Sequence, residues 1–249
     1  GSISNLNFQE VPKAINSSID LSDEQSYQMA INDKYLVLAY PYEDSSGTGI
    51  SNLIPAGTDS SSENSGAVYV YTKNIDDSWE FMSQIKASNA EQGDLFGASV
   101  SLFENTLVVS APGEDSLSNG VFPSIGGASN EAQISNLASS SGAVYIFTNS
   151  AAEGWQQTHY IKPNENVVAG DGYDNGFGST VLLNNDVLLI SAPKEDSKEG
   201  VQGDASKPNS GAVFIYAFTD EWEFLQTLKA NNVDPGDNFG ASLALENNR

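Results

Sequence analysis

Three pairs of neighbouring carboxylates are the side chains of this chain best suited to chemistry. Glu43-Asp44, Glu114-Asp115 and Glu195-Asp196 each follow an X-Pro-X segment and directly precede a serine. Carboxylates gathered from adjacent loops can bind Ca²⁺ or a cationic ligand, because hard cations prefer oxygen ligands. Asp and Ser also stabilise turns through hydrogen bonds to the backbone. Because every copy of a repeat needs the same turn, the recurrence fits both interpretations.

Further aspartates stand shortly before three Phe-Gly dipeptides. In an antiparallel hairpin the second strand ends beside the start of the first, so we expect Asp94 near Glu114-Asp115 and Asp174 near Glu195-Asp196. By the same logic Glu43-Asp44 lies near Asp23-Glu24. The candidate metal ligands are Asp94, Asp115, Asp174, Asp196 and Asp237. The candidate ligand-binding residues are Tyr42, Glu43, Asp44, Glu114, Asp115, Glu195 and Asp196.

Familiar catalytic constellations are missing from the sequence. His159 is the single histidine and cysteine is absent, which excludes a Ser-His-Asp triad and a histidine-rich metal site. Polysaccharide cleavage by the clustered carboxylates is one alternative, and it requires two carboxyl groups about 5 to 9 Å apart with different pKa values. Equivalent clusters in every repeat argue against it, because catalysis needs one asymmetric site. We therefore assign no catalytic residue.

The elements that position these residues repeat along the chain. A seven-residue phrase, Ser-Gly-Ala-Val followed by alternating aromatic and aliphatic residues, begins at Ser65, Ser141 and Ser210. Its alternation predicts a β-strand, with Val144 and Ile146 on one face and Tyr145 and Phe147 on the other. The aromatic residues could form a sugar-stacking stripe, but packing between sheets is the favoured interpretation. They are Tyr69, Tyr71, Tyr145, Phe147, Phe214 and Tyr216.

Each repeat predicts four antiparallel strands, and helical periodicity is weak throughout. In the middle copy the expected strands cover residues 98–102, 106–112, 141–148 and 155–161. A repeated four-stranded unit is typical of the blade of a β-propeller, so we predict an all-β propeller segment spanning residues 1–249. The expected complete blades cover about 26–86, 96–162 and 177–229, with partial strands at 6–14 and 239–245. The glycine after each Phe is attributed to crowding near the central axis.

The ordered motifs resemble the FG-GAP repeat, the unit of the integrin α-subunit propeller and of many bacterial surface proteins. The likeness rests on Phe-Gly, Ala-Pro and Gly-Ala-Val segments in sequence, as in Phe96-Gly97, Ala111-Pro112 and Gly142-Ala143-Val144. A Trp in each fourth strand is similar to the bacterial secreted branch. The resemblance implies a ligand-binding face made of the loops that join strand two to strand three and one blade to the next. The longest insertions, residues 42–64, 113–140 and 194–209, lie there.

The integrin-type calcium loop is not found in this sequence. That family carries an Asp-rich loop between its first and second strands, which cages a hard cation. Here a tight turn takes its place, at Asn32-Asp33, Glu104-Asn105 and Asn184-Asn185-Asp186. No cofactor is therefore required, and Ca²⁺ remains possible only at the acidic clusters described above.

The charge balance excludes some partners. Ten Lys and Arg against 33 Asp and Glu give a formal net charge of -23, which repels nucleic acid and anionic membrane surfaces. No apolar run approaches a membrane span, so we expect no membrane insertion and place any targeting or anchoring segment outside this chain.

The sequence therefore predicts an extracellular or cell-surface bacterial binding or adhesion module with a protein or polysaccharide ligand. The alternatives are the polysaccharide-acting enzyme and a structural spacer in a large adhesin. Three complete units are too few to close a ring. Either a longer parent chain supplies the remaining blades, which is the favoured interpretation, or a second copy of this chain does.

Overall fold

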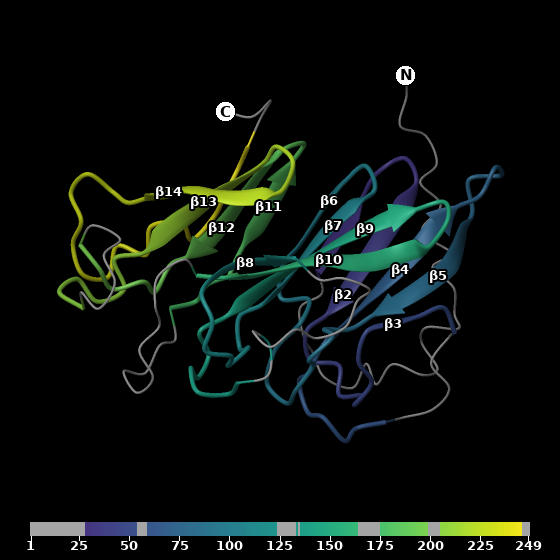
Figure 1. Ribbon diagram of the computed structural model, residues 1–249, viewed down its shortest axis with the longest axis horizontal. Coiled ribbons are helices and arrows are strands. Elements are labelled where there is room, and N and C mark those ends of the chain that lie inside the picture. The colour runs from purple at the N-terminus through teal and green to yellow at the C-terminus, as the bar shows by residue number, and fades with distance from the viewer. Residues whose placement is uncertain are drawn as a thin grey trace.

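The protein is seen in a computed structural model that describes residues 28–53, 59–123, 133, 135–163, 175–198 and 205–245 (Figure 1). Within these ranges the chain forms fourteen strands in three sheets. No helix there is long and apolar enough to cross a membrane. The prediction of an all-β chain is confirmed.

All three sheets are antiparallel, with strands joined largely by hairpins. The first sheet has the order β1 (Gln28–Ile31), β2 (Tyr35–Tyr40), β4 (Ala67–Lys73), β5 (Trp79–Ile85), β3 (Ile50–Ser51). The second has the order β6 (Val100–Phe103), β7 (Thr106–Ala111), β9 (Ala143–Ser150), β10 (Gly154–Lys162), β8 (Gly120–Pro123). The third has the order β11 (Val181–Asn184), β12 (Val187–Ala192), β13 (Ala212–Phe218), β14 (Trp222–Leu228).

A fifth strand in the first and second sheets corrects the prediction of four-stranded units. β3 pairs with β5, and β8 pairs with β10. Both lie inside the long insertions at residues 42–64 and 113–140, for which the sequence predicts loops. They cover the outer edge of their sheets, where unpaired N–H and C=O groups would otherwise face solvent.

The two predicted partial strands have different outcomes. Residues 6–14 lie outside the described residues. Residues 239–245 are described and form no strand, only a turn and bends. A strand needs a hydrogen-bonded neighbour, and no second strand stands beside this segment in the described ranges.

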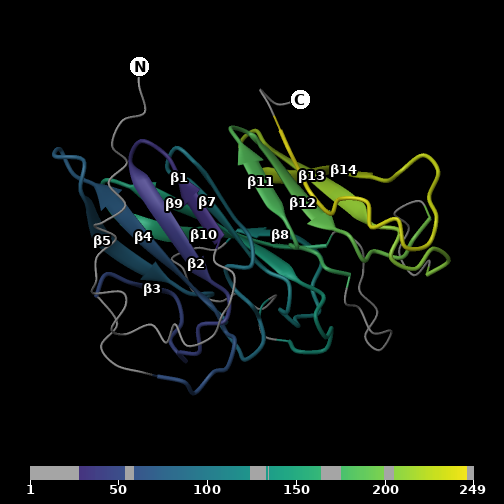
Figure 2. The same ribbon diagram turned by 180° about the vertical axis from the view of Figure 1, so that it is seen from behind.

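The second sheet packs between the other two, and Figures 1 and 2 show the three lying side by side. Its Tyr145 and Phe147 join a core with the first sheet, whereas Val144 and Ile146 join a core with the third. The two faces thus divide as predicted. All six aromatic residues of the repeated phrases are at most 3 % exposed, which rules out a surface stripe. Tyr145, Phe147, Phe214 and Tyr216 pack between sheets as predicted, whereas Tyr69 and Tyr71 pack in a cluster of first-sheet residues.

The first strands of the three sheets, β1, β6 and β11, lie next to one another. Side-chain hydroxyls connect two of them directly: the N–H groups of Val181 and Leu183 donate to Ser99 Oγ at 3.0 Å and Ser101 Oγ at 2.9 Å. The sheets therefore fan out from a common inner edge. They do not close into a ring within the described residues.

The repeated phrase owes its glycine to a close contact between successive sheets. Each Gly has a positive φ, and a Cβ there would collide with the carbonyl oxygen of the next Phe-Gly dipeptide. The contacts are Gly66 with Phe96 at 2.1 Å, Gly142 with Phe177 at 2.2 Å and Gly211 with Phe239 at 2.3 Å. Backbone hydrogen bonds strengthen the same seam, as from Phe96 N–H to Ser65 O at 3.2 Å.

The glycine of the Phe-Gly dipeptide has a related explanation, which sharpens the predicted crowding at the axis. Gly97 has φ +100°, and a Cβ there would lie 3.2 Å from Ala39 Cβ and 3.3 Å from Ala67 O. The crowding thus comes from the preceding sheet. The backbone conformation of Gly97 is also one that glycine adopts most easily.

Replacing Gly142 by Ala should lower the free energy of unfolding by about 3 kcal/mol or more, because it adds a steric collision to an unfavourable positive φ. Gly154→Ala is the matched control: Gly154 has φ +72°, but nothing lies within 4 Å of the position that a Cβ would take there. We expect the control to cost about 1 kcal/mol. Urea unfolding measures both, and equal losses would contradict the seam.

Candidate functional site

The glutamates of the three acidic pairs are largely buried and form ion pairs with lysine. Glu43 Oε2 accepts from Lys86 Nζ at 2.5 Å, and Glu114 Oε2 accepts from Lys162 Nζ at 2.6 Å. The third sheet repeats the arrangement with Glu195 and Lys229. The Glu114 and Lys162 side chains are only 3 % and 0 % exposed. These carboxylates therefore face the protein interior.

The serine of the repeated phrase completes each ion pair. Lys86, Lys162 and Lys229 donate to Ser65, Ser141 and Ser210 Oγ at 3.0, 2.6 and 2.8 Å. Each hydroxyl in turn donates to the glutamate's backbone carbonyl, at 3.2 to 3.4 Å. We call these groups the loop clamps; they are Glu43-Ser65-Lys86, Glu114-Ser141-Lys162 and Glu195-Ser210-Lys229.

Sequence reasoning missed the lysines, although a signal was present. Each stands seven residues after a fourth-strand tryptophan, as Lys162 does after Trp155, which places it at the loop end of that strand. Burial lowers the pKa of Lys162, while the Glu114 charge opposes that shift. Burial likewise lowers the pKa of Lys86, and the Glu43 charge opposes that shift.

The aspartates of the pairs close the base of each loop. Asp44 Oδ1 accepts from Asn64 N–H at 2.7 Å, Asp115 Oδ1 from Ser140 N–H at 2.5 Å, and Asp196 Oδ1 from Asn209 N–H at 2.7 Å. Glutamate and aspartate thus have separate structural tasks. The geometry supports the turn-forming interpretation of the repeated Glu-Asp-Ser. Tyr42, the remaining candidate, is exposed.

Asp94 lies beside the Glu114-Asp115 pair, as expected: Gly113 N–H donates to Asp94 O at 3.1 Å. Its carboxylate accepts from Glu91 N–H at 2.8 Å, and Asp237 accepts from Asp234 N–H at the same distance. Asp174, Asp23 and Glu24 lie outside the described residues. In the part of the chain that the structure describes, no three carboxylate or histidine side chains are grouped to hold a metal ion.

Hydrogen bonds connect the longest loop to the link between the first and second sheets. Gln133 is 2 % exposed, and its amide donates to Ser88 Oγ at 2.9 Å and Asn89 Oδ1 at 3.1 Å. Asn89 donates to Glu114 Oε1 at 3.0 Å, and Tyr145 OH donates to Asn89 Oδ1 at 2.7 Å. The network connects the loop to the second sheet's clamp.

Replacing Glu114 by Gln should lower the free energy of unfolding by about 3 to 5 kcal/mol, because Lys162 would keep a buried charge without its partner. Asp77→Asn is the control, since it removes the ion pair between Asp77 and Lys73, whose side chains are 83 % and 35 % exposed. We expect little change there. Comparable losses in urea unfolding would show that the clamp contributes no more than a surface pair.

The burial of the Asp94 carboxyl predicts that the stability of the fold depends on pH. Burial, helped by the charges of Glu114, Glu91 and Asp115, raises its pKa to about 8 from 3.8. Between these values the unfolded chain binds fewer protons than the folded one, so this carboxyl lowers stability as pH rises. Its contribution is fully favourable below pH 3.8 and lost by about pH 8.

Asp94→Asn should therefore gain stability relative to the parent chain as pH rises from 4 to 8, by at most about 1.4 kcal/mol per pH unit. Asparagine retains an oxygen that can accept from Glu91 N–H. Asp237→Asn is the control at the same turn position, where the carboxyl is exposed. Chemical unfolding across this pH range makes the measurement, and a difference that does not vary with pH would contradict it.

Comparison with known protein families identifies one repeat in this chain. A family model described as the FG-GAP repeat matches residues 79–122. The match runs from β5 through the Phe96-Gly97 turn and the Glu114-Asp115 pair to β8. A search of curated proteins found no match.

Proposed function

We propose that this chain is a ligand-binding or adhesion module built as part of a β-propeller of FG-GAP type. It binds through the loops that join β2 to β4, β7 to β9 and β12 to β13, and through the links between successive sheets. We further propose that it works outside the cell, in a secreted or surface protein of the bacterial branch. The FG-GAP match at residues 79–122 supports the module type.

The observation that carries this proposal is a constant loop base beneath loops of unequal length. The Asp hydrogen bond at the base joins residues 20, 25 and 13 positions apart in the first, second and third sheets. A scaffold that fixes the ends of its loops tolerates changes between them, and such loops commonly carry binding function. Each clamp therefore holds the two ends of a loop on the folded sheet, and the loop between them carries the proposed binding contacts.

Four of the exposed large apolar side chains lie on these loops. Tyr42, Leu53, Leu117 and Leu137 are 38 %, 78 %, 36 % and 64 % exposed, and all four lie in the insertions of the first two sheets. Apolar groups presented on a polar surface are typical contacts for a macromolecular partner. The formal charge of -23 favours a neutral or cationic partner and disfavours nucleic acid.

Grafting the third loop onto the second sheet tests the proposal. Residues 117–139 are replaced by residues 198–208, which leaves Asp115, Ser140 and the clamp in place. We expect cooperative unfolding to persist and binding to arrayed bacterial glycans and surface proteins to weaken about tenfold or more.

The reverse graft, which inserts residues 117–139 into the third loop, is the matched control and should retain binding. Unchanged binding after the first graft would contradict the assignment to this loop. A parent chain that binds nothing on the arrays would contradict the module itself.

A further inference from the structure

The link that follows the second sheet is longer than the other two, where a link is the segment from a clamp lysine to the next Phe-Gly dipeptide. Phe177 stands 15 positions after Lys162, whereas the two other links place the Phe 10 positions after the clamp lysine. The residues directly before Phe177 are Asn175 and Gly176, and the structure describes both. This Asn-Gly dipeptide lies outside the three clamps.

Backbone hydrogen bonds show which residues of the links are equivalent. The carbonyl of Asn175 accepts from Lys194 N–H at 3.2 Å, as the carbonyl of Asp94 accepts from Gly113 N–H at 3.1 Å. Both donors directly follow an Ala-Pro dipeptide. Counted back from the Phe-Gly dipeptide, Asp237 takes the same place in the link after the third sheet. Asn175 therefore stands where the other two links carry an aspartate.

The backbone at Gly176 lacks a hydrogen bond that both other links make. Leu95 N–H donates to Asn64 O at 3.0 Å, and Asn238 N–H donates to Asn209 O at the same distance. Gly176 is the equivalent residue, directly before the Phe, and it shares their positive φ. Within the described ranges its N–H donates no hydrogen bond. The longer link thus leaves this nitrogen without the contact that fixes its counterparts.

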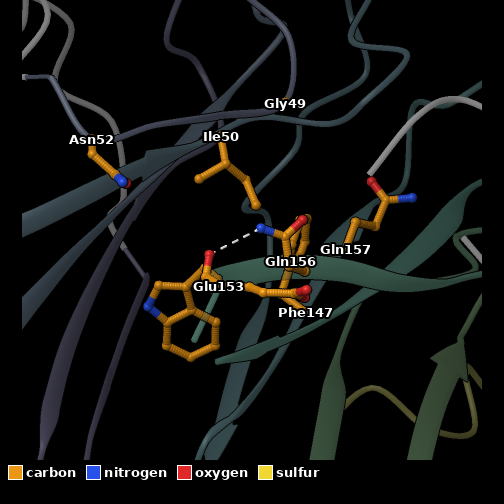
Figure 3. A pocket seen from close by; sticks show the side chains of 8 residues that line it. Gly49, Ile50, Asn52, Phe147, Glu153, Gln156 and Gln157 are labelled. Atoms are coloured by element: carbon orange, nitrogen blue, oxygen red, sulfur yellow. Dashed lines mark hydrogen bonds between the residues drawn. The ribbon is translucent and has the colours of Figure 1, made fainter. Parts of the chain in front are cut away.

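The Asn175 side chain is not anchored as its counterparts are. Asp94 and Asp237 each accept from the N–H group three positions earlier, at 2.8 Å in both cases. Asn175 is half-buried, and its amide makes no hydrogen bond in the part of the chain that the structure describes. By contrast the amide of Gln156 is held, because its Nε2 donates to Glu153 O at 3.1 Å (Figure 3). The Asn175 side chain is therefore able to turn toward the backbone of the next residue.

An asparagine that precedes a glycine can react with its own backbone. The glycine nitrogen loses its proton and attacks the asparagine Cγ, and the side-chain amide group leaves with a proton as ammonia. The succinimide ring that remains is opened by water at either carbonyl, which gives aspartate or isoaspartate. No oxidant, reductant or cofactor takes part. We propose that Asn175 is a self-modification site of this kind, with the Gly176 nitrogen as the nucleophile.

The fold does not require glycine at this position, because Leu95 and Asn238 adopt φ values of 59° and 50° where Gly176 has 67°. A glycine leaves the nitrogen unshielded. The aspartate product gives this link the residue that the other two carry. The isoaspartate product adds one carbon to the backbone beside Phe177, whose carbonyl lies against Gly142. Either product adds a negative charge to the formal net charge of -23.

The sequence contains a second Asn-Gly dipeptide, Asn119-Gly120, which serves as an internal comparison. Gly120 begins β8 and pairs with Lys162 of β10, so the sheet holds its backbone. A backbone group held in this way reacts only through local opening. We therefore expect the reaction to be slower there.

Mass spectrometry of the native chain measures the reaction at both dipeptides in one sample. The chain is kept folded at neutral pH in ¹⁸O-labelled water and then digested, and each peptide is followed for replacement of its amide by an ¹⁸O-labelled carboxyl group. We expect Asn175 to be modified about tenfold or more faster than Asn119, with release of ammonia. In urea the two rates should converge. Asn175→Asp supplies the reference peptide that distinguishes aspartate from isoaspartate.

Two variants test the roles of the two residues. Asn175→Gln should abolish the labelling, because the longer side chain closes a ring much more slowly. Gly176→Leu installs the residue that the first link carries at this position and should slow the labelling severalfold by shielding the nitrogen. Melting temperatures show that both variants fold.

A native chain in which Asn175 keeps its amide, or in which Asn119 is modified as fast, overturns the proposal. A Gly176→Leu variant that folds and is modified at the rate of the parent chain also overturns it. None of these measurements involves a ligand, so their outcome is independent of the proposed binding function.

Discussion

A buried lysine at the end of β5, β10 and β14 holds the ends of each variable loop to the constant sheet. Lys162 Nζ binds the Glu114 carboxylate that begins the loop and the Ser141 hydroxyl that ends it. The glycine that follows this serine must then lie against the backbone of the next Phe-Gly dipeptide. One cation thus fixes the loop ends, and the loop ends fix the distance between successive sheets. Because a buried ion without its partner is strongly destabilising, all members of the group depend on each other.

The use of lysine inside the protein also shapes its surface. The chain has ten Lys and Arg residues against 33 Asp and Glu, and the three clamp lysines have side chains at most 8 % exposed. The positive charges available at the surface are therefore even fewer than the composition suggests. Such a field favours approach of neutral or cationic partners. It fits the binding module that we propose.

Much of the sheet structure followed from local sequence. Strict alternation placed Tyr145 and Phe147 opposite Val144 and Ile146, because side-chain period in a strand is independent of the rest of the fold. The fifth strands were missed because β3 and β8 are short segments within polar insertions. They are strands only because an outer edge is available to pair with them.

The clamps depend on contacts that sequence alone does not provide. Lys162 and Glu114 are 48 positions apart, and their pairing requires the register of three strands. The tryptophan-to-lysine spacing was visible, but it acquired a meaning only once both ends were placed.

Native-state hydrogen exchange resolved by residue measures most directly whether the clamps separate fold from loops. The N–H groups of Gly66, Gly142 and Gly211 donate to the clamp glutamates' carbonyls at 2.8, 3.0 and 2.9 Å. They should exchange only through global unfolding, with the same free energy as the central strands, while amides within residues 117–119 and 135–137 exchange through small local openings. Exchange of the Gly142 amide at the rate of its loop would show that the clamp opens with the loop and would contradict this account.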